Sequence, residues 1–144
     1  MFKNIKKVHF VGLVSEGGVH SSQAHLHTLC DMAQNFGLEH YFVHAITDGR
    51  DCDPKSGLTY LQNLEQHLST QKGKIATLIG RYYAMDRDKR WERVAKAYHL
   101  LVNGQGAVAI SASAALEASY LKAQTDEFVL PHLIEPNGLI EPGD

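Results

Sequence analysis

Apolar positions along this chain alternate between strand-like and helix-like patterns. Mostly apolar, β-prone runs occupy positions 8–15, 40–47 and 75–79, and such runs are typical of buried parallel strands. Each run leads into a polar loop and then into apolar residues spaced as on one face of a helix. Strand–loop–helix units in succession predict an α/β fold, with an open, mostly parallel sheet and flanking helices.

The apolar stripes of the predicted helices identify the side chains that we expect to be buried. They are Leu26, Leu29, Cys30, Ala33 and Phe36 in the first helix, Leu58, Leu61, Leu64 and Leu68 in the second, and Trp91, Val94, Ala95, Tyr98, Leu101 and Val102 in the third. Ser21 or Ser22 can cap the start of the first helix, and Gly37 is placed to end it.

The remainder of the chain is less regular. We expect a short strand at 108–110, an alanine-rich helix at 113–124 and another short strand after Pro131. The Asn137-Gly138 pair, followed by Leu139 and Ile140, predicts a β-hairpin. We expect residues 1–144 to form one α/β domain.

Composition excludes several classes of protein. The 144 residues are 44% hydrophobic and 21% charged, as is ordinary for a globular domain. The formal net charge of −2 gives no overall bias toward nucleic acid or membrane, and no apolar run is long enough to span a bilayer. The start of the chain is basic and then apolar, like a signal peptide, but its apolar run is short, and we interpret it as the first strand.

Motifs of common cofactor and metal sites are absent from the sequence. Cys30 and Cys52 are the only cysteines, and their spacing favours a reducing cytoplasmic location over a disulfide framework or zinc site. No histidine pair has the HExxH spacing, so we expect no metal site in this chain. There is also no GxGxxG, Walker P-loop or GxSxG motif.

Polar loops at 16–22, 48–57 and 80–90 follow the predicted strands. Right-handed crossovers place the carboxyl ends of parallel strands on one edge of the sheet, where ligands bind in open α/β folds. The candidate site residues in these loops are His20, Arg50, Asp51, Arg81 and Arg87. Guanidinium groups can grip a carboxylate or phosphate, and a carboxylate beside them can accept a proton from a substrate hydroxyl. The loops therefore predict a site for a small anionic substrate.

Each loop also has a purely structural interpretation. The arginine-rich segment 81–93 could be a solvated, salt-bridged helix start. Asp51 could simply cap the helix that follows its turn. The convergence of several polar loops on one edge favours a site over either alternative.

The chain contains four distinctive motifs: SEGGVHS at 15–21, HAITDGRD at 44–51, GRYYAMDRDKRW at 80–91 and DEFVLP at 126–131. These motifs resemble the signature loops of the cofactor-independent (2,3-bisphosphoglycerate-independent) phosphoglycerate mutase family. The resemblance covers nearly the whole chain. Glu16 stands where many members of the family have aspartate, at a position outside the expected contacts.

The resemblance implies an isomerase of glycolysis and gluconeogenesis that interconverts 3-phosphoglycerate and 2-phosphoglycerate through a phosphoserine intermediate. Such enzymes have an alkaline-phosphatase-like domain, with a nucleophilic serine and two metal ions, usually manganese. A second α/β domain, inserted into the first, holds the glycerate. This chain resembles a large part of the inserted domain only, so we expect it to be inactive alone and to need the phosphatase-like domain as its partner.

The resemblance also implies roles for individual residues. His20, Arg50, Asp51, Arg81 and Arg87 would bind the substrate. Asp51 would be the catalytic acid/base, and Arg81 and Arg87 would hold the carboxylate and phosphate end. The family's further arginine motif follows the Asp144 region and is absent here. The rival hypothesis is a stand-alone regulatory module that binds a small phosphorylated acid, which an open reading frame limited to these residues would support.

Overall fold

The computed structural model describes residues 6–144, which include the whole of the predicted first strand at 8–15. The strands are β1 (Val8–Leu13), β2 (Tyr41–Thr47), β3 (Lys74–Gly80), β4 (Ala107–Val108) and β5 (His132–Leu133). The helices are α1 (Gln23–Asn35), α2 (Gly57–Leu68), α3 (Arg81–Ala84), α4 (Trp91–Asn103) and α5 (Ala112–Leu121), with 3-10 turns η1 (Asp126–Phe128) and η2 (Pro136–Gly138).

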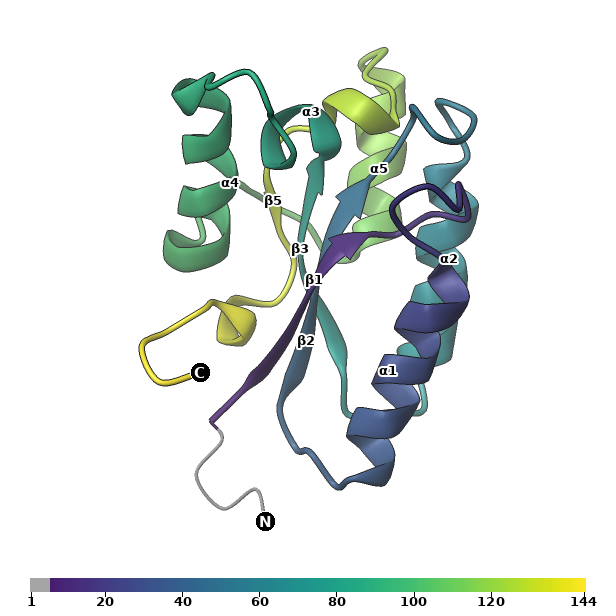
Figure 1. Ribbon diagram of the computed structural model, residues 1–144, viewed down its shortest axis with the longest axis vertical. Coiled ribbons are helices and arrows are strands. Elements are labelled where there is room, and N and C mark those ends of the chain that lie inside the picture. Colours follow the sequence, from purple (N-terminus) through teal and green to yellow (C-terminus); the bar gives the residue numbers. More distant parts are fainter. Residues whose placement is uncertain (1–5) are drawn as a thin grey trace.

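The strands form one five-stranded open sheet in the order β1-β2-β3-β5-β4. β1, β2 and β3 pair in parallel, and β4 pairs in parallel with β5, while β5 runs antiparallel to β3. The predicted α/β fold with a mostly parallel sheet is confirmed. The carboxyl ends of β1, β2 and β3 therefore point to the same edge, at the top of Figure 1.

Helices lie on both faces of the sheet (Figure 1). On one face, α1, α2 and α5 enclose the larger core, which contains fully buried side chains such as Tyr41, Leu61, Leu64, Leu78 and Leu116. On the other face, α4 covers a smaller cluster of Leu13, Ile46, Ile79, Leu100 and Leu133. No helix among residues 6–144 is long and apolar enough to cross a membrane.

The predicted buried stripe is confirmed for α2, where Leu61, Leu64 and Leu68 are buried and Leu58, partly buried, packs against the same core. It is only partly right for α1. Cys30 and Ala33 are buried, but Leu29 and Phe36 are 44% and 62% exposed. α1 packs beside the edge strand β1, so only a narrow stripe of the helix reaches the core. Gly37 has a φ of +73° just beyond the helix, as its predicted role as helix stop requires.

The predicted buried face of α4 is only partly right: Val94, Ala95, Leu101 and Val102 are partly buried, but the two aromatic residues are not. Trp91 and Tyr98 are 69% and 59% exposed, and Leu100 is the only fully buried residue of the helix. Ala97 and Leu101 pack beside Leu100 in the smaller cluster. The two aromatic side chains of the predicted face, Trp91 and Tyr98, are therefore largely exposed instead of packing on the sheet.

Two local predictions are also corrected. The segment Pro136–Gly138 forms a 3-10 turn rather than a hairpin. A Cβ on Gly138 would lie 2.5 Å from the Ala76 Cβ, so packing against the sheet determines this turn. Ser22 is the N-cap of α1 but makes no capping hydrogen bond. Instead, the Ser21 hydroxyl donates to the Leu13 carbonyl at 2.6 Å and ties the loop to the end of β1.

Candidate functional site

The loops after β1 and β2 touch directly. A Cβ on Gly17 would lie 2.7 Å from the Asp51 Cβ and 2.9 Å from the Asp51 carbonyl oxygen, so only glycine allows this approach. The same contact brings His20 Nε2 to 4.0 Å from Asp51 Oδ2. The predicted convergence of these loops is confirmed.

Arg81 joins them from the third strand. It is the first residue of α3, directly after β3, and only 7% of its side chain is exposed. Its Nη1 donates to Asp48 Oδ1 at 2.6 Å and to Asp51 Oδ2 at 2.7 Å. Burial works to lower the pKa of Arg81, but the hydrogen bonds to Asp51 and Asp48 outweigh it and raise the pKa. Arg81 is therefore a fixed cation shared between two carboxylates.

Asp48 is the most enclosed group of the site, with 2% of its side chain exposed. Its Oδ1 accepts from the Arg50 and Asp51 backbone N–H groups at 3.1 and 3.0 Å, and its Oδ2 accepts from the Ser15 hydroxyl at 2.7 Å. Burial acts to raise the pKa of Asp48, but these hydrogen bonds and the one from Arg81 prevail and lower it. Sequence reasoning did not assign Asp48 or Ser15 to the site, although both lie within the matching motifs.

Arg50 points to a different partner. Its Nε and Nη2 donate to Glu127 Oε1 at 2.7 and 2.6 Å, while 47% of the Arg50 side chain stays exposed. Glu127 lies in η1, far from Arg50 in the sequence. Gly49 permits this contact: its φ is +74°, and a Cβ there would lie 2.8 Å from the Glu127 backbone nitrogen.

The segment containing η1 braces the 48–57 loop through Asp126, which is fully buried. Asp126 Oδ2 accepts from the Gly57 N–H at 2.8 Å, and Oδ1 accepts from the Tyr120 hydroxyl. The Thr47 hydroxyl donates to the Asp126 carbonyl oxygen at 2.6 Å. These contacts connect the end of β2, the start of α2 and α5. The DEFVLP motif was the sequence signal for this segment, but its bracing contacts are visible only in the structure.

The Arg87 side chain, like the guanidinium of Arg50, is not brought to Asp51. It is exposed in the segment between α3 and α4 and makes no hydrogen bond or ion pair within residues 6–144. Neighbouring side chains are better anchored: Arg93 lies 3.5 Å from Asp86 Oδ1 and stacks over the Tyr82 ring at 3.8 Å. Arg87 is thus a cation with all of its donors available.

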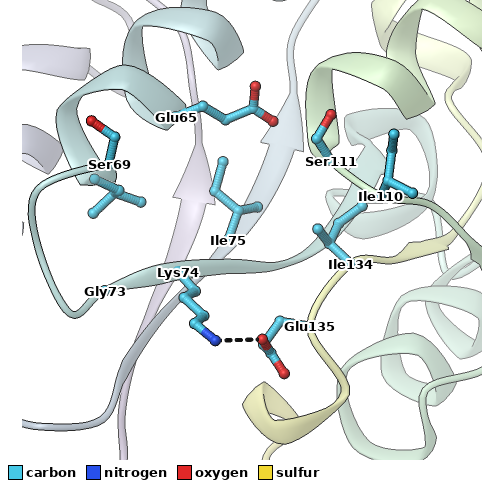
Figure 2. A pocket seen from close by; sticks show the side chains of 10 residues that line it. Glu65, Ser69, Gly73, Lys74, Ile75, Ile110, Ser111, Ile134 and Glu135 are labelled. Atoms are coloured by element: carbon cyan, nitrogen blue, oxygen red, sulfur yellow. Dashed lines mark hydrogen bonds and ion pairs between the residues drawn. The ribbon is translucent and has the colours of Figure 1, made fainter.

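The candidate site is an open edge of loops. A cavity of about 430 Å³ opens elsewhere, at the beginning of β3, where Lys74 pairs with Glu135 beside Ile75 and Ile134 (Figure 2). None of the predicted site residues lines it. His20 does line a separate cavity of about 380 Å³ along β1. Within residues 6–144, no group of three or more His, Cys, Asp or Glu side chains could hold a metal ion.

Comparison with known proteins gives one consistent result. The family model described as "BPG-independent PGAM N-terminus (iPGM_N)" matches residues 1–144. The chain is 54% identical over 146 aligned residues to the 2,3-bisphosphoglycerate-independent phosphoglycerate mutase of Parabacteroides distasonis, covering 99% of this chain and 29% of that protein. It is 53% identical to the enzyme of the same name from Bacteroides thetaiotaomicron, with 99% and 28% covered.

A solved structure agrees with these sequence matches. A crystal structure of Leishmania mexicana phosphoglycerate mutase, determined at low cobalt concentration, superposes with a TM-score of 0.90 at 30% identity. The match covers 96% of this chain and 28% of that one, so the chain spans little more than a quarter of the length of these relatives. The chain belongs to the 2,3-bisphosphoglycerate-independent phosphoglycerate mutase family and corresponds to its N-terminal (iPGM_N) region.

Proposed function

We propose that residues 1–144 are a substrate-holding part of an enzyme that interconverts 3-phosphoglycerate and 2-phosphoglycerate through a phosphoserine. The observation that carries the proposal is the position of Asp51. This carboxylate lies between His20, at 4.0 Å, and Arg81, at 2.7 Å, on the edge where three parallel strands end. A proton acceptor beside a fixed cation, Arg81, and a histidine suits the hydroxyl chemistry of an anionic substrate.

Each side chain has a defined task in this proposal. Asp51 takes the proton from the glycerate hydroxyl that attacks the phosphoserine, and returns it in the reverse direction. His20 lies on the exposed side of Asp51 and hydrogen-bonds the substrate. Arg81 and Arg87 hold the carboxylate and phosphate end, and Arg50 contributes a further contact.

The charges of the site determine how strongly this part alone can bind. Arg81 is balanced by Asp48 and Asp51, and Arg50 is balanced by Glu127. Arg87 is the predicted substrate ligand without such a partner among the described residues. Anion binding must therefore compete with internal ion pairs, and we expect an affinity no better than roughly millimolar, about 4 kcal/mol.

The isolated chain should have no mutase activity. The described residues hold no cluster suited to a metal ion, and the proposal assigns the nucleophilic serine and two manganese or similar ions to a phosphatase-like domain elsewhere in a cytoplasmic enzyme. That domain is the expected partner of the loop edge.

The test is single-turnover kinetics of the complete enzyme with Asp51→Asn. Asparagine keeps the shape of the side chain but cannot accept the proton, so phosphoryl transfer should slow by about 10²–10⁴ with little change in substrate affinity. Asp53→Asn is the matched control, because Asp53 is exposed in the same loop and its side chain accepts, among the described residues, only from the Lys55 backbone N–H. Near-normal turnover of Asp51→Asn would refute the acid/base assignment.

A further inference from the structure

We infer that Asp48 is a positioning residue of the reaction: it holds Arg81 as a counter-ion so that Asp51 is free to move the proton. This inference rests on the proposed function, and it concerns a residue that touches no substrate in that proposal. It is carried by the hydrogen bonds that Asp48 makes to all three loops and by the difference in exposure between the two carboxylates.

Asp48 joins every part of the site. Ser15 reaches it from the end of β1, the Arg50 and Asp51 N–H groups from the turn after β2, and Arg81 from the end of β3. One carboxylate thus fixes both the backbone that carries Asp51 and the guanidinium that faces it. A neutral side chain would meet the backbone donors equally well, so the backbone contacts alone do not require a charge at this position.

The requirement for a charge comes from Arg81. A guanidinium buried beside a single carboxylate would form a one-to-one ion pair with it, and breaking that pair would leave an unpaired buried charge. Here the same Nη1 is shared, and Asp48 is the enclosed partner, with 2% of its side chain exposed against 18% for Asp51. When Asp51 leaves Arg81 or accepts a proton, Arg81 still has its ion pair with Asp48. The buried cation is never left without a counter-ion during the proton transfer.

Removing only the charge of Asp48 should therefore lower the turnover rate without weakening substrate binding. In Asp48→Asn, the amide oxygen can still accept from the two backbone N–H groups. Arg81 then has one carboxylate left, pairs more tightly with Asp51, and holds it back from the substrate hydroxyl. At the same time, the site loses a negative charge and should bind an anionic substrate somewhat better.

The experiment is steady-state and single-turnover kinetics of the complete enzyme with Asp48→Asn, Ser15→Ala and the control Asp53→Asn. Asp48→Asn should lower kcat by about 10–100-fold, with KM unchanged or reduced a few-fold. Ser15→Ala removes one of the bonds that orient the carboxylate and should lower kcat about threefold to tenfold at unchanged KM. Asp53→Asn should match the wild type in both constants.

The outcomes discriminate between positioning and a merely structural role. A structural role predicts a raised KM together with a lower melting temperature, and that result would overturn the inference, as would wild-type kcat in Asp48→Asn. If Asp48→Asn does not fold, the Ser15→Ala variant tests the inference instead, because wild-type kinetics of Ser15→Ala would contradict it. If Asp51→Asn is also fully active, the proposed function has failed; if Asp51→Asn is inactive and the two positioning variants are normal, only this inference has failed.

Discussion

Replacing Tyr120 with phenylalanine tests the brace behind the 48–57 loop. The ring of Tyr120 packs against the larger core, and its hydroxyl donates to the fully buried carboxyl group of Asp126. Tyr120→Phe keeps the ring and removes only this donor. Asp126 then retains the Gly57 N–H as a hydrogen-bond donor to its side chain. A lost hydrogen bond to a buried carboxyl group costs about 1–3 kcal/mol, which we expect as the loss in unfolding free energy.

The pH dependence of this loss follows from Asp126. Burial raises the pKa of Asp126 in the folded state above its unfolded value of about 4. The stability that this group contributes is therefore fully present below the unfolded pKa and is lost as the pH rises through the folded pKa. The Tyr120 hydroxyl opposes burial and lowers the pKa of Asp126. Removing the hydroxyl raises it further. The cost of Tyr120→Phe should therefore be smallest in acid and grow as the pH rises through the folded pKa of Asp126.

Urea denaturation followed by circular dichroism, at several pH values between 4 and 8, measures this effect. Tyr60→Phe is the matched control, since Tyr60 packs against the same core and its hydroxyl makes no hydrogen bond with the described residues. It should change stability by less than about 0.5 kcal/mol. Equal losses in the two variants, or a cost of Tyr120→Phe that does not depend on pH, would show that the Tyr120–Asp126 contact does not brace the loop.

Three further predictions concern stability. Gly80→Ala would place a Cβ 2.3 Å from the Glu127 carbonyl oxygen and should cost about 2 kcal/mol or more by thermal melting, whereas Gly12→Ala, with nothing within 4 Å, should be tolerated. Leu61→Ala empties a fully buried position and should cost about 2–5 kcal/mol in urea denaturation. Burial and, to a lesser extent, the neighbouring His9 lower the pKa of His44 to about 4. The stability that this group contributes is therefore present above about pH 6.5 and should be lost as the pH falls toward 4, by about 3 kcal/mol in total. If His44→Gln leaves the pH dependence of the unfolding free energy unchanged, this prediction is contradicted.

The physical patterns of the sequence were sufficient to predict the fold class and the convergence of the loops after the first three strands. Apolar runs of strand length and stripes at helical spacing both reflect the periodicity of backbone geometry, which acts locally. The handedness of crossovers then brings the loops after β1, β2 and β3 to one edge without any knowledge of side-chain contacts. For these reasons His20, Asp51 and Arg81 could be placed together in advance.

The local sequence pattern did not determine how much of each helix would be buried. The stripe of α2 is correct because that helix lies over the centre of the sheet, between neighbours. α1 and α4 each bury only part of their apolar stripe, so Leu29, Phe36, Trp91 and Tyr98 stay exposed despite their hydrophobicity. The Asn137-Gly138 signal failed for a similar reason, since close packing of Gly138 against Ala76 and Phe42 overrides the local preference for a hairpin.

The sequence by itself determined which residues stand at the loop edge, and the tertiary structure decided which of them are paired. Ion pairs such as Arg81–Asp48 and Arg50–Glu127 join positions 33 and 77 residues apart, and such pairs depend on distances that no local pattern encodes. Only the folded chain shows that Asp48 is enclosed, that Arg50 is held by Glu127 and that Arg87 is exposed and unpaired among the described residues. The physical reason is that residue type fixes what a side chain can bind, whereas burial and distance fix what it does bind.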